Sequence, residues 1–361
     1  MKPYSIYFPQ FYPIPTNDKA WGVGFTDWTL VANANLRERW SRRAPLRGFY
    51  DGADSLVHSA QMEEMVASGL GGMAVYHYWF YTHQELSAFE QTLLNGGDRN
   101  DLPWFLIWAT EDWSRRWLGD SSKILTLNNE PSRADIELHC HYLLACFERP
   151  SYFRWCDRPL FVWYNLDHFK FPEKVIKQYR ECFQALGVKV AMGSFLKKPF
   201  ERKYSALTDV TYLFEPRLFF HQQRLVRSVA KPILDVSKRL FGENVVRRLL
   251  ISTERVRKGR IFSAQEFLDY WRSQERLELI SSLPGSIQEV LSPGWNNTPR
   301  YGEYFTALED IRPEYFSELI NTAKLKNSSL PPLINAWNEW SEGAAIEPCA
   351  YFGRRYLDMF I

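Results

Sequence analysis

Two glutamates three residues apart, Glu339 and Glu342, are the side chains of this sequence best suited to chemistry. They lie in the segment Asn335–Gly343, which ends an apolar run from Leu330 to Trp337 and surrounds the carboxyls with indoles and amides. Paired carboxyl groups act as general acid and general base. Aromatic faces stack on sugar rings, and amides hold hydroxyl groups. The segment therefore predicts acid–base chemistry on a carbohydrate.

The spacing of the pair favours one stereochemical outcome. If Trp340 and Ser341 form a helical turn, the two carboxyls share one side, with Cβ atoms about 5–6 Å apart. Retaining glycosidases hold their carboxyls about 5–5.5 Å apart and inverting ones about 6.5–9.5 Å, so retention is favoured. Like charges this close raise the pKa of one group, which leaves one acid and one base. The alternative is a solvated turn whose charges face water.

Eight short apolar or aromatic runs predict the scaffold, because most are followed by a helical stretch and each ends in polar or turn residues. The predicted strands are Tyr4–Phe8, Gly72–Tyr78, Trp104–Trp108, Leu160–Tyr164, Lys189–Ser194, Val210–Phe214, Ile287–Leu291 and Leu333–Trp337. The predicted helices are Ser55–Ala67, Leu86–Leu94, Ser132–Phe147, Pro172–Leu186 and Pro313–Leu325. Eight β/α units predict an α/β fold, a single (β/α)8 barrel of the TIM type over residues 1–361.

An open doubly wound sheet is the alternative, but it would usually carry a glycine-rich phosphate loop after a strand, and no GxGxxG follows a predicted strand here. Two excursions interrupt the alternation. The first loop, Pro15–Ala53, holds Trp21, Phe25, Asp27 and Trp28, and we expect it to cover the barrel mouth. A helical insertion over residues 221–283 follows the sixth strand and is basic between Arg224 and Arg260.

Residues that follow the strands of such a barrel line its active site. Polar and aromatic residues gather after the first, second, third, seventh and eighth predicted strands, so we expect them at one mouth. The side chains predicted to bind substrate are Gln10, Trp28, Tyr76, His77, Tyr78, Trp79, Glu111, Asp112, Trp113, Arg115, Arg116, Trp295, Asn296, Asn335, Trp337, Asn338, Trp340 and Glu347.

Each cluster also has a purely structural interpretation. The run Tyr76–Phe80 could be core aromatics, with His77 a hydrogen-bonded core histidine. The charges between Glu111 and Arg116 could form an exposed ion-pair network of little energetic value. The segment Trp295–Arg300 could be a loop whose Pro and Asn were selected for turn geometry.

Composition narrows the class of protein. The balance of 44 basic and 42 acidic side chains, net charge +2, gives no reason to expect nucleic acid as a partner. Aromatic residues make up 16% of the chain. The five cysteines include no CxxC pair, so we expect neither a disulfide framework nor a zinc site, and no metal or cofactor. We see no secretory signal and no apolar stretch of about 20 residues. A cytoplasmic enzyme is expected.

Taken together, six stretches resemble the WbsX-like proteins of bacterial polysaccharide gene clusters, a glycosyltransferase family related to glycoside hydrolase family 99. They are Tyr7–Pro15, Trp21–Trp28, Tyr76–Phe80, Trp113–Trp117, Trp295–Arg300 and Asn335–Pro348. Any one of them is weak, but all six in this order are specific and span almost the whole chain. The resemblance implies a (β/α)8 barrel.

The resemblance also implies roles for the two glutamates. Glu339 would be the base that removes the proton of a sugar 2-hydroxyl, and Glu342 the acid that protonates the leaving oxygen and then the base for the acceptor. An anhydro-sugar intermediate would give net retention on α-linked, manno-configured sugars. The chain departs from the family pattern at Thr110, Asp112, Asn296 and Ala345, which puts specificity in doubt more than chemistry.

Several functions remain open at this point. The enzyme would cleave or transfer a glycosyl unit in surface-polysaccharide (O-antigen, capsule, lipopolysaccharide) metabolism, on an oligo- or polysaccharide that could be lipid-linked. A nucleotide-sugar-dependent glycosyltransferase is an alternative, although the sequence holds no DxD motif. A non-catalytic carbohydrate-binding barrel is another. The basic residues 224–260 could rest on an anionic membrane surface, giving peripheral attachment at the inner membrane; the alternative is a solvated helical insertion.

Overall fold

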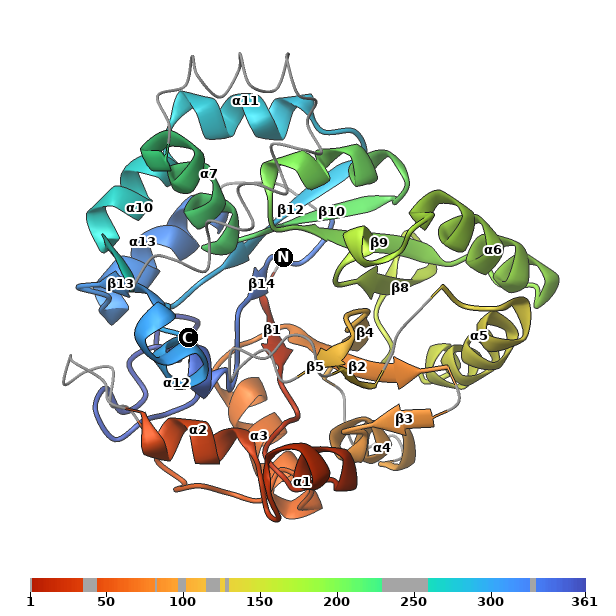
Figure 1. Ribbon diagram of the computed structural model, residues 1–361, viewed down its shortest axis with the longest axis horizontal. Helices are drawn as coiled ribbons and strands as arrows, with labels where there is room; N and C mark the ends of the chain where they lie inside the picture. Colours follow the sequence, from red (N-terminus) through yellow and green to blue (C-terminus); the bar gives the residue numbers. More distant parts are fainter. Residues whose placement is uncertain are drawn as a thin grey trace.

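A computed structural model describes residues 2–34, 44–81, 83–96, 102–114, 124–126, 130–228, 259–324 and 329–361. Its centre is a closed barrel of eight parallel strands that pair in chain order (Figure 1). These are β1 (Tyr4–Tyr7), β2 (Gly72–Phe80), β4 (Trp104–Trp108), β8 (Arg158–Trp163), β9 (Ala191–Leu196), β10 (Val210–Phe214), β12 (Ser286–Leu291) and β14 (Leu333–Ile334). Because β1 pairs with both β2 and β14, the sheet closes. The predicted (β/α)8 barrel is confirmed.

The barrel strands are mostly apolar because both of their faces are covered. All five residues of β4 are buried, and the ring of Phe105 lies 6.2 Å from that of Tyr4 and 6.4 Å from that of Tyr212 inside the barrel. Aromatic rings therefore fill the interior. Gly72 begins β2 against the Tyr4 ring and the Pro103 carbonyl, where an added Cβ would overlap both.

The helices predicted from spacing surround the barrel. They are α3 (Ser55–Ala67), α4 (Ala88–Asn95), α5 (Arg133–Phe147), α6 (Pro172–Ala185) and α13 (Pro313–Lys324). Local signals set their starts: Ser132 and Asp135 form a capping box at α5, and Pro172 occupies the first turn of α6.

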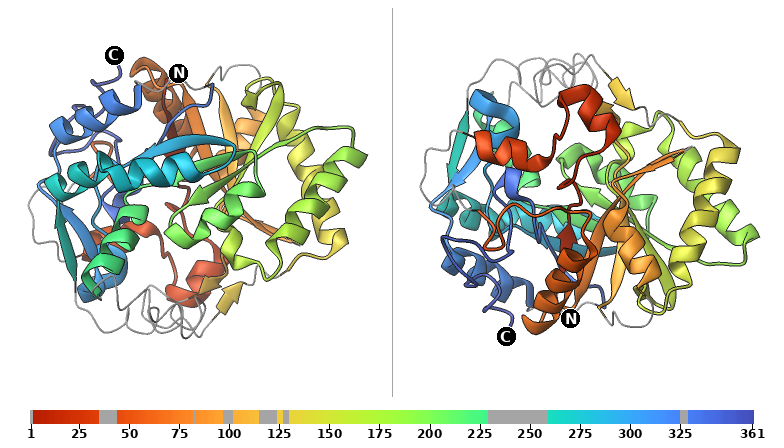
Figure 2. Two further views of the ribbon diagram at one scale, coloured as in Figure 1. Left: turned by 90° about the horizontal axis from the view of Figure 1, so that it is seen from above. Right: turned by 90° about the horizontal axis from the view of Figure 1, so that it is seen from below.

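The long first loop folds over one end of the barrel. It contains α1 (Pro15–Trp21) and α2 (Asp27–Asn33), which Figure 2 shows in red at the end opposite to the two chain termini. Its helix α2 packs on η7 (Trp340–Glu342), the 3₁₀ turn that carries the glutamate pair. The sequence-based prediction that this loop covers the barrel mouth is thus met by α2.

The insertion after the sixth strand contains α7 (Arg217–Ser228), β11 (Arg260–Ser263), α10 (Ala264–Trp271) and α11 (Gln274–Ser282). Its strand β11 pairs in parallel with β13 (Thr306–Glu309), which forms a small second sheet that the sequence did not predict. Most of the basic stretch 224–260 lies outside the described residues, so its proposed membrane contact stays a prediction.

The remaining short elements connect these layers. They are β3 (His83–Glu85), β5 (Trp113–Ser114), β6 (Ile124–Thr126), β7 (Arg154–Trp155), η4 (Leu166–His168), η5 (Pro199–Ala206), α12 (Thr298–Tyr301) and η6 (Gly302–Tyr304). None of the helices that the structure describes is long and apolar enough to cross a bilayer.

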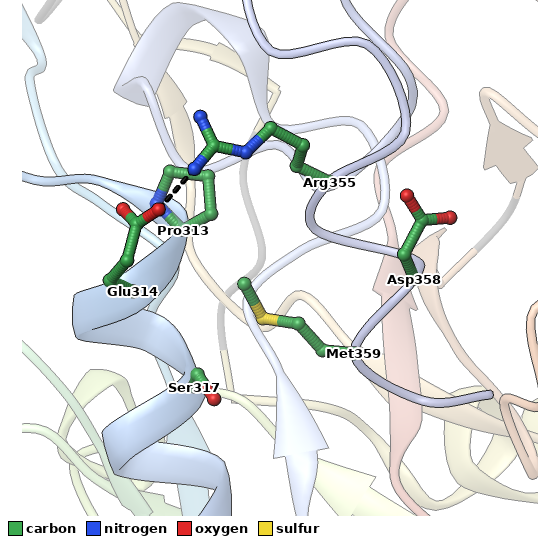
Figure 3. A pocket seen from close by; sticks show the side chains of 6 residues that line it. All are labelled: Pro313, Glu314, Ser317, Arg355, Asp358 and Met359. Atoms are coloured by element: carbon green, nitrogen blue, oxygen red, sulfur yellow. Dashed lines mark hydrogen bonds and ion pairs between the residues drawn. The ribbon is translucent and has the colours of Figure 1, made fainter.

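The chain ends without a regular helix. Residues 354–359 form turns, and the carbonyl of Phe360 packs beside Gly69, just before β2. Between these turns and α13 lies a shallow pocket lined by Pro313, Glu314, Ser317, Arg355, Asp358 and Met359, with Arg355 paired to Glu314 (Figure 3). This pocket lies on the outside of the barrel and contains none of the predicted site residues.

Candidate active site at the carboxyl end of the barrel

The glutamate pair sits on a tightly fixed turn just after β14. Asn338 accepts a hydrogen bond from the Phe8 amide (2.8 Å) and donates one to the Phe8 carbonyl (2.8 Å), which ties the turn to the end of β1. The predicted helical turn between the glutamates is the 3₁₀ turn η7. Both carboxyls are 4% exposed, so the alternative of a solvated turn is wrong.

One arginine holds both carboxyls together. Arg300, in α12, donates from Nη2 to Glu339 Oε1 (2.7 Å) and from Nη1 to Glu342 Oε1 (2.8 Å). Its Nη2 also lies 3.4 Å from Asp27 Oδ1, so α2 of the first loop reaches the same guanidinium group. Arg217, the first residue of α7, adds a second cation at 3.2 Å from Glu342 Oε1. The two glutamates are therefore close neighbours, as their spacing predicted.

The environment of Glu339 favours its protonated form. Burial raises the pKa of Glu339 to about 8; Arg300 opposes this shift, while Glu342 and Asp27 add to it. Burial likewise raises the pKa of Asp27, against the attraction of Arg300. The site thus gathers three carboxyls around two arginines with almost no water contact. A carboxyl whose pKa lies near the working pH is suited to moving protons.

Aromatic rings form the wall facing the pair. On β2, Tyr76 and Tyr78 point into the barrel: the Tyr76 ring lies 6.3 Å from Phe8 and 5.6 Å from Tyr164, and the charge of Glu339 acts on both tyrosines. Trp113 packs edge-on against Tyr78 at 5.3 Å. The structure therefore brings three predicted aromatic residues to the side of the mouth that holds Glu339.

A second set of polar side chains lies just after the strands β4, β8 and β9. Glu111 accepts a hydrogen bond from Asn165 Nδ2 (2.9 Å), and Asp112 lies 3.5 Å from His168. Lys197 donates to the Tyr164 carbonyl (2.7 Å) from above the Tyr164 ring. Burial lowers the pKa of Lys197 to about 8, against the attraction of Glu201 and Glu111. The interpretation of Glu111 and Asp112 as exposed surface charges is not supported, since both are partly buried among these neighbours.

Two predicted residues belong to the outer side of β2. His77 Nδ1 contacts Glu90 (2.9 Å), its Nε2 contacts His139 Nε2 (3.0 Å), and Trp79 stacks on His139 with ring centres 4.8 Å apart. Since Glu90 and His139 lie on α4 and α5, these side chains fill the layer between barrel and helices. The prediction that His77 and Trp79 bind substrate is wrong, because successive strand residues point to opposite faces.

Other predicted residues form hydrogen bonds within the protein that hold the catalytic turn and the first loop in place. Asn338 uses its amide on Phe8, Trp340 donates to Glu347 (3.0 Å), and Trp28 donates to the Tyr50 carbonyl (2.8 Å). Among the other residues that were predicted to bind substrate, Gln10, Trp295, Asn335 and Trp337 are buried, as is Glu347, and Asn296 is partly buried. For Asn338, Trp340 and Glu347 these bonds correct the prediction of direct sugar contact. Arg115 and Arg116 lie outside the described residues.

The residues that sequence reasoning missed are mostly cations. Arg300 closes the predicted cluster Trp295–Arg300, Lys197 directly follows β9, and Arg217 stands three residues after β10; neither of these two strand ends was predicted to contribute to the mouth. Asp27 stood in the first-loop motif, and Tyr164 ended a predicted strand. What these residues share in the sequence is a position just after a barrel strand or within one of the motifs. Which of them form ion pairs with each other follows only from the three-dimensional arrangement.

Known proteins resemble this chain over nearly its whole length. The family model described as glycosyltransferase WbsX matches residues 3–360. Two curated relatives, both called uncharacterized protein WxcX, come from Xanthomonas campestris pv. campestris strains B100 and ATCC 33913. Each is 28% identical over 98% of this chain, which spans 48% of the relative's own length.

Solved structures show the same fold. A GH99 endo-alpha-mannosidase from Bacteroides thetaiotaomicron, in complex with bis-tris-propane, superposes with a TM-score of 0.56 at 14% identity, covering 99% of this chain and 94% of that one. A glycoside hydrolase-like protein gives 0.56 at 13% identity, covering 100% and 93%. At such identities the likeness is one of fold.

Proposed function

We propose, since the chain belongs to the glycosyltransferase WbsX family, that it breaks or transfers a glycosidic bond with Glu339 and Glu342 as its acid–base pair. Family membership supports a glycan-acting enzyme, and an oligo- or polysaccharide as its substrate. The observation that carries the catalytic proposal is the fork of Arg300, which holds both buried carboxyls on one guanidinium group at the barrel mouth.

The proposed reaction uses the two carboxyls in turn on an α-linked, manno-configured sugar. Glu339 removes the 2-hydroxyl proton as O2 attacks C1 from the face opposite the leaving group, and Glu342 protonates the departing oxygen. The product is a 1,2-anhydro sugar. Glu342 then removes a proton from the acceptor, which opens the three-membered ring at C1, while Glu339 returns its proton to O2. Two inversions give net retention.

A specific observation favours exchanging these two roles. Burial raises the pKa of Glu339 to about 8, whereas Glu342 contacts two guanidinium groups. A protonated Glu339 would suit the role of the acid rather than that of the base. The aromatic wall formed by Tyr76 and Tyr78 lies on the same side as Glu339.

Glutamine variants tested on two kinds of donor separate these assignments. We expect Glu339→Gln and Glu342→Gln each to lose about 10³-fold or more in kcat on labelled α-manno-oligosaccharides, the magnitude associated with acid–base residues. Fluoride leaves without protonation, so the variant that lacks the acid should recover on α-manno-configured glycosyl fluorides when azide is added as a nucleophile that needs no base in the second step. The variant lacking the 2-hydroxyl base should not recover. Near-native activity of either variant on the oligosaccharides would refute the proposal.

Hydrolysis and transglycosylation use the same donor and differ in the acceptor, which is water in the first reaction and a glycan in the second. The resemblance to proteins of polysaccharide gene clusters favours a growing surface polysaccharide, such as O-antigen, as acceptor, including a lipid-linked one. The proposed location of this reaction is the cytoplasm. Incubation of a lipid-linked oligosaccharide with and without nucleotide sugar tests this. Lengthening only with the nucleotide sugar identifies a nucleotide-sugar transferase, redistribution of chain lengths without it a transglycosylase, and shortening alone a hydrolase. Tight binding without any product would identify a carbohydrate-binding barrel.

Peripheral membrane contact through residues 224–260 is a separate proposal, supported by the density of Arg and Lys in that stretch. Flotation with phosphatidylglycerol-containing vesicles at low salt, and release at high salt, is the expected result. Absence of flotation at low salt would remove the proposal.

A further inference from the structure

A buried network beneath the catalytic turn involves no substrate-facing atom. Its centre is the Glu347 carboxyl, which is 1% exposed. Oε2 accepts hydrogen bonds from Tyr50 Oη (3.0 Å) and Trp340 Nε1 (3.0 Å), and Oε1 accepts one from Gln61 Nε2 (2.9 Å). Gln61 in turn accepts a hydrogen bond from Tyr7 Oη (3.0 Å). One carboxyl thus joins the catalytic turn to α3, to β1 and to the first loop.

The connection reaches both glutamates through one side chain. Trp340 is the first residue of η7 and stands between Glu339 and Glu342 in the chain. Asn338, two residues before Trp340, is bonded to Phe8, and the Glu347 bond fixes the indole, so the chain is held on both sides of Glu339. A shift of the Trp340 backbone would move both glutamates, because Glu342 lies on the same three-residue turn and Glu339 directly precedes it.

The same network also fixes the loop that supplies Asp27. The Tyr50 carbonyl accepts a hydrogen bond from Trp28 Nε1 (2.8 Å), and Trp28 adjoins Asp27, which contacts Arg300. Tyr50 therefore bonds Glu347 through its hydroxyl and α2 through its carbonyl. The catalytic turn and the first loop are therefore joined twice, once through Arg300 and once through Glu347.

We infer that Glu347 is a positioning residue, whose hydrogen bonds to Trp340 and Tyr50 hold Glu339 and Glu342 in the geometry that Arg300 bridges. The inference rests on the proposed function of that pair. Hydrogen bonding rather than charge is the essential property, because all three contacts are donors to the carboxyl, and the nearest cation among the described residues is Arg47, whose Nε lies 4.0 Å away.

A conservative substitution of Glu347 should preserve the hydrogen bonds of this network. In Glu347→Gln the amide oxygen can replace Oε2 toward Tyr50 and Trp340, and the amide nitrogen replaces Oε1. If Gln61 turns its amide over, its oxygen accepts a hydrogen bond from the newly introduced amide nitrogen. The Gln61 nitrogen then donates to Tyr7, whose hydroxyl accepts as readily as it donates. Every hydrogen bond survives although the charge is lost.

The variants to compare are Glu347→Gln, Glu347→Leu and Trp340→Phe, with Glu90→Gln as matched control. Glu90 is also buried and bonded by two side chains, but it lies in the outer layer beside His77 and Tyr142. The assay is cleavage of α-manno-configured glycosyl fluorides and labelled manno-oligosaccharides. We expect kcat of Glu347→Leu and Trp340→Phe to fall about 10- to 100-fold with little change in KM, the size of effect that a small misplacement produces.

Glu347→Gln and Glu90→Gln are expected to keep kcat within about threefold of the parent, since neither disturbs the turn. If Glu347→Leu does not fold, Trp340→Phe decides. The inference is overturned if Trp340→Phe keeps parental kcat, if Glu90→Gln falls as far, or if Glu347→Gln falls as far as Glu347→Leu. If Glu339→Gln and Glu342→Gln remain active in the same assay, the proposed function fails instead.

Discussion

Arg300 contacts Asp27, Glu339 and Glu342 with a single guanidinium group that is 7% exposed. Burying three carboxyls without a cation would be strongly unfavourable, because each loses its hydration. The planar fork also orients the two glutamates relative to each other, which a point charge cannot do. Arg300 therefore serves the stability of the mouth and the geometry of the pair at once.

Replacing this arginine should separate charge from geometry. Arg300→Lys keeps a cation but cannot bridge both glutamates, so we expect kcat/KM to fall about 100-fold with a modest loss of stability. Arg300→Met leaves the carboxyls unpaired and should lower the free energy of unfolding by about 3–5 kcal/mol, measured by urea titration. As a control, Arg133→Met on the surface of α5 should change it by less than about 0.5 kcal/mol. Parental kcat/KM in Arg300→Lys would contradict the bridging role.

The pH dependence of kcat/KM should report Glu339, whose pKa burial raises to about 8. If Glu339 acts as the base it must be ionised, so kcat/KM should rise with pH through about 8. If it acts as the acid, kcat/KM should fall through the same range. In Asp27→Asn, removing a neighbouring negative charge should move this limb to lower pH in either case. A limb that is unchanged in Asp27→Asn would exclude Glu339 as its source.

At the scale of the element, β2 shows what a sequence can and cannot reveal. Composition and length predicted this strand, and its end was placed correctly at the mouth. The alternation of its faces separates Tyr76 and Tyr78, which point inward, from His77 and Trp79, which point to α5. A continuous aromatic run carries no polar–apolar alternation, so the sequence could not tell which face was which.

The side chains on the outward face of β2 lead to a prediction about how the stability of the protein depends on pH. His139 Nδ1 can accept a hydrogen bond from the Tyr179 hydroxyl (2.8 Å) while its Nε2 donates to His77, an arrangement that requires a neutral His139 ring. Burial, and then His77, lower the pKa of His139 well below 6.5. Since the unfolded chain takes up a proton near pH 6.5 that the folded one refuses, stability should fall as the pH drops below that value.

The test compares two histidines of one helix. In His139→Phe the loss of unfolding free energy between pH 7 and pH 5 should be smaller than in the parent, as followed by urea titration. His141 lies on the exposed side of α5, and His141→Phe should keep the parental pH dependence. Equal pH dependence in His139→Phe and the parent would contradict the assignment.

At the scale of the whole molecule, the sequence predicted the eight strands and their order because most of the parallel barrel strands are short, predominantly apolar runs. It did not predict the small sheet of β11 and β13, whose strands lie far apart in the chain and are only four residues each. Nor did it predict the ion pairs across the mouth, because Arg300 and Arg217 come from different β/α units than the glutamates they contact.

The insertion is joined to the barrel by a buried triad. Arg276 of α11 contacts Glu215, after β10, and Glu289 of β12, and lies 3.9 Å over the Trp271 ring. We expect Arg276→Leu to lower the free energy of unfolding by about 3–5 kcal/mol. Burial raises the pKa of Glu215 to about 7, against the attraction of Arg276, so Glu215 destabilises the fold as pH rises from about 4.5 to 7.

Urea titrations at pH 5 and pH 8 check both statements. The loss in Arg276→Leu should be larger at pH 8, because without Arg276 the pKa of Glu215 in the folded protein rises further above its value in the unfolded chain. A loss below about 1 kcal/mol at both pH values would show that the triad does not anchor the insertion.

The way in which the chain ends has a practical consequence for handling the protein. Lys2 packs beside Gly71 and Phe360 beside Gly69, so both ends of the described chain meet at the start of β2, on the side opposite to the glutamates. A tag, a fused partner or a solid support attached at either end would face away from the mouth. Immobilised molecules would therefore present their acid–base pair to the solution, which suits them to capturing large glycans from it.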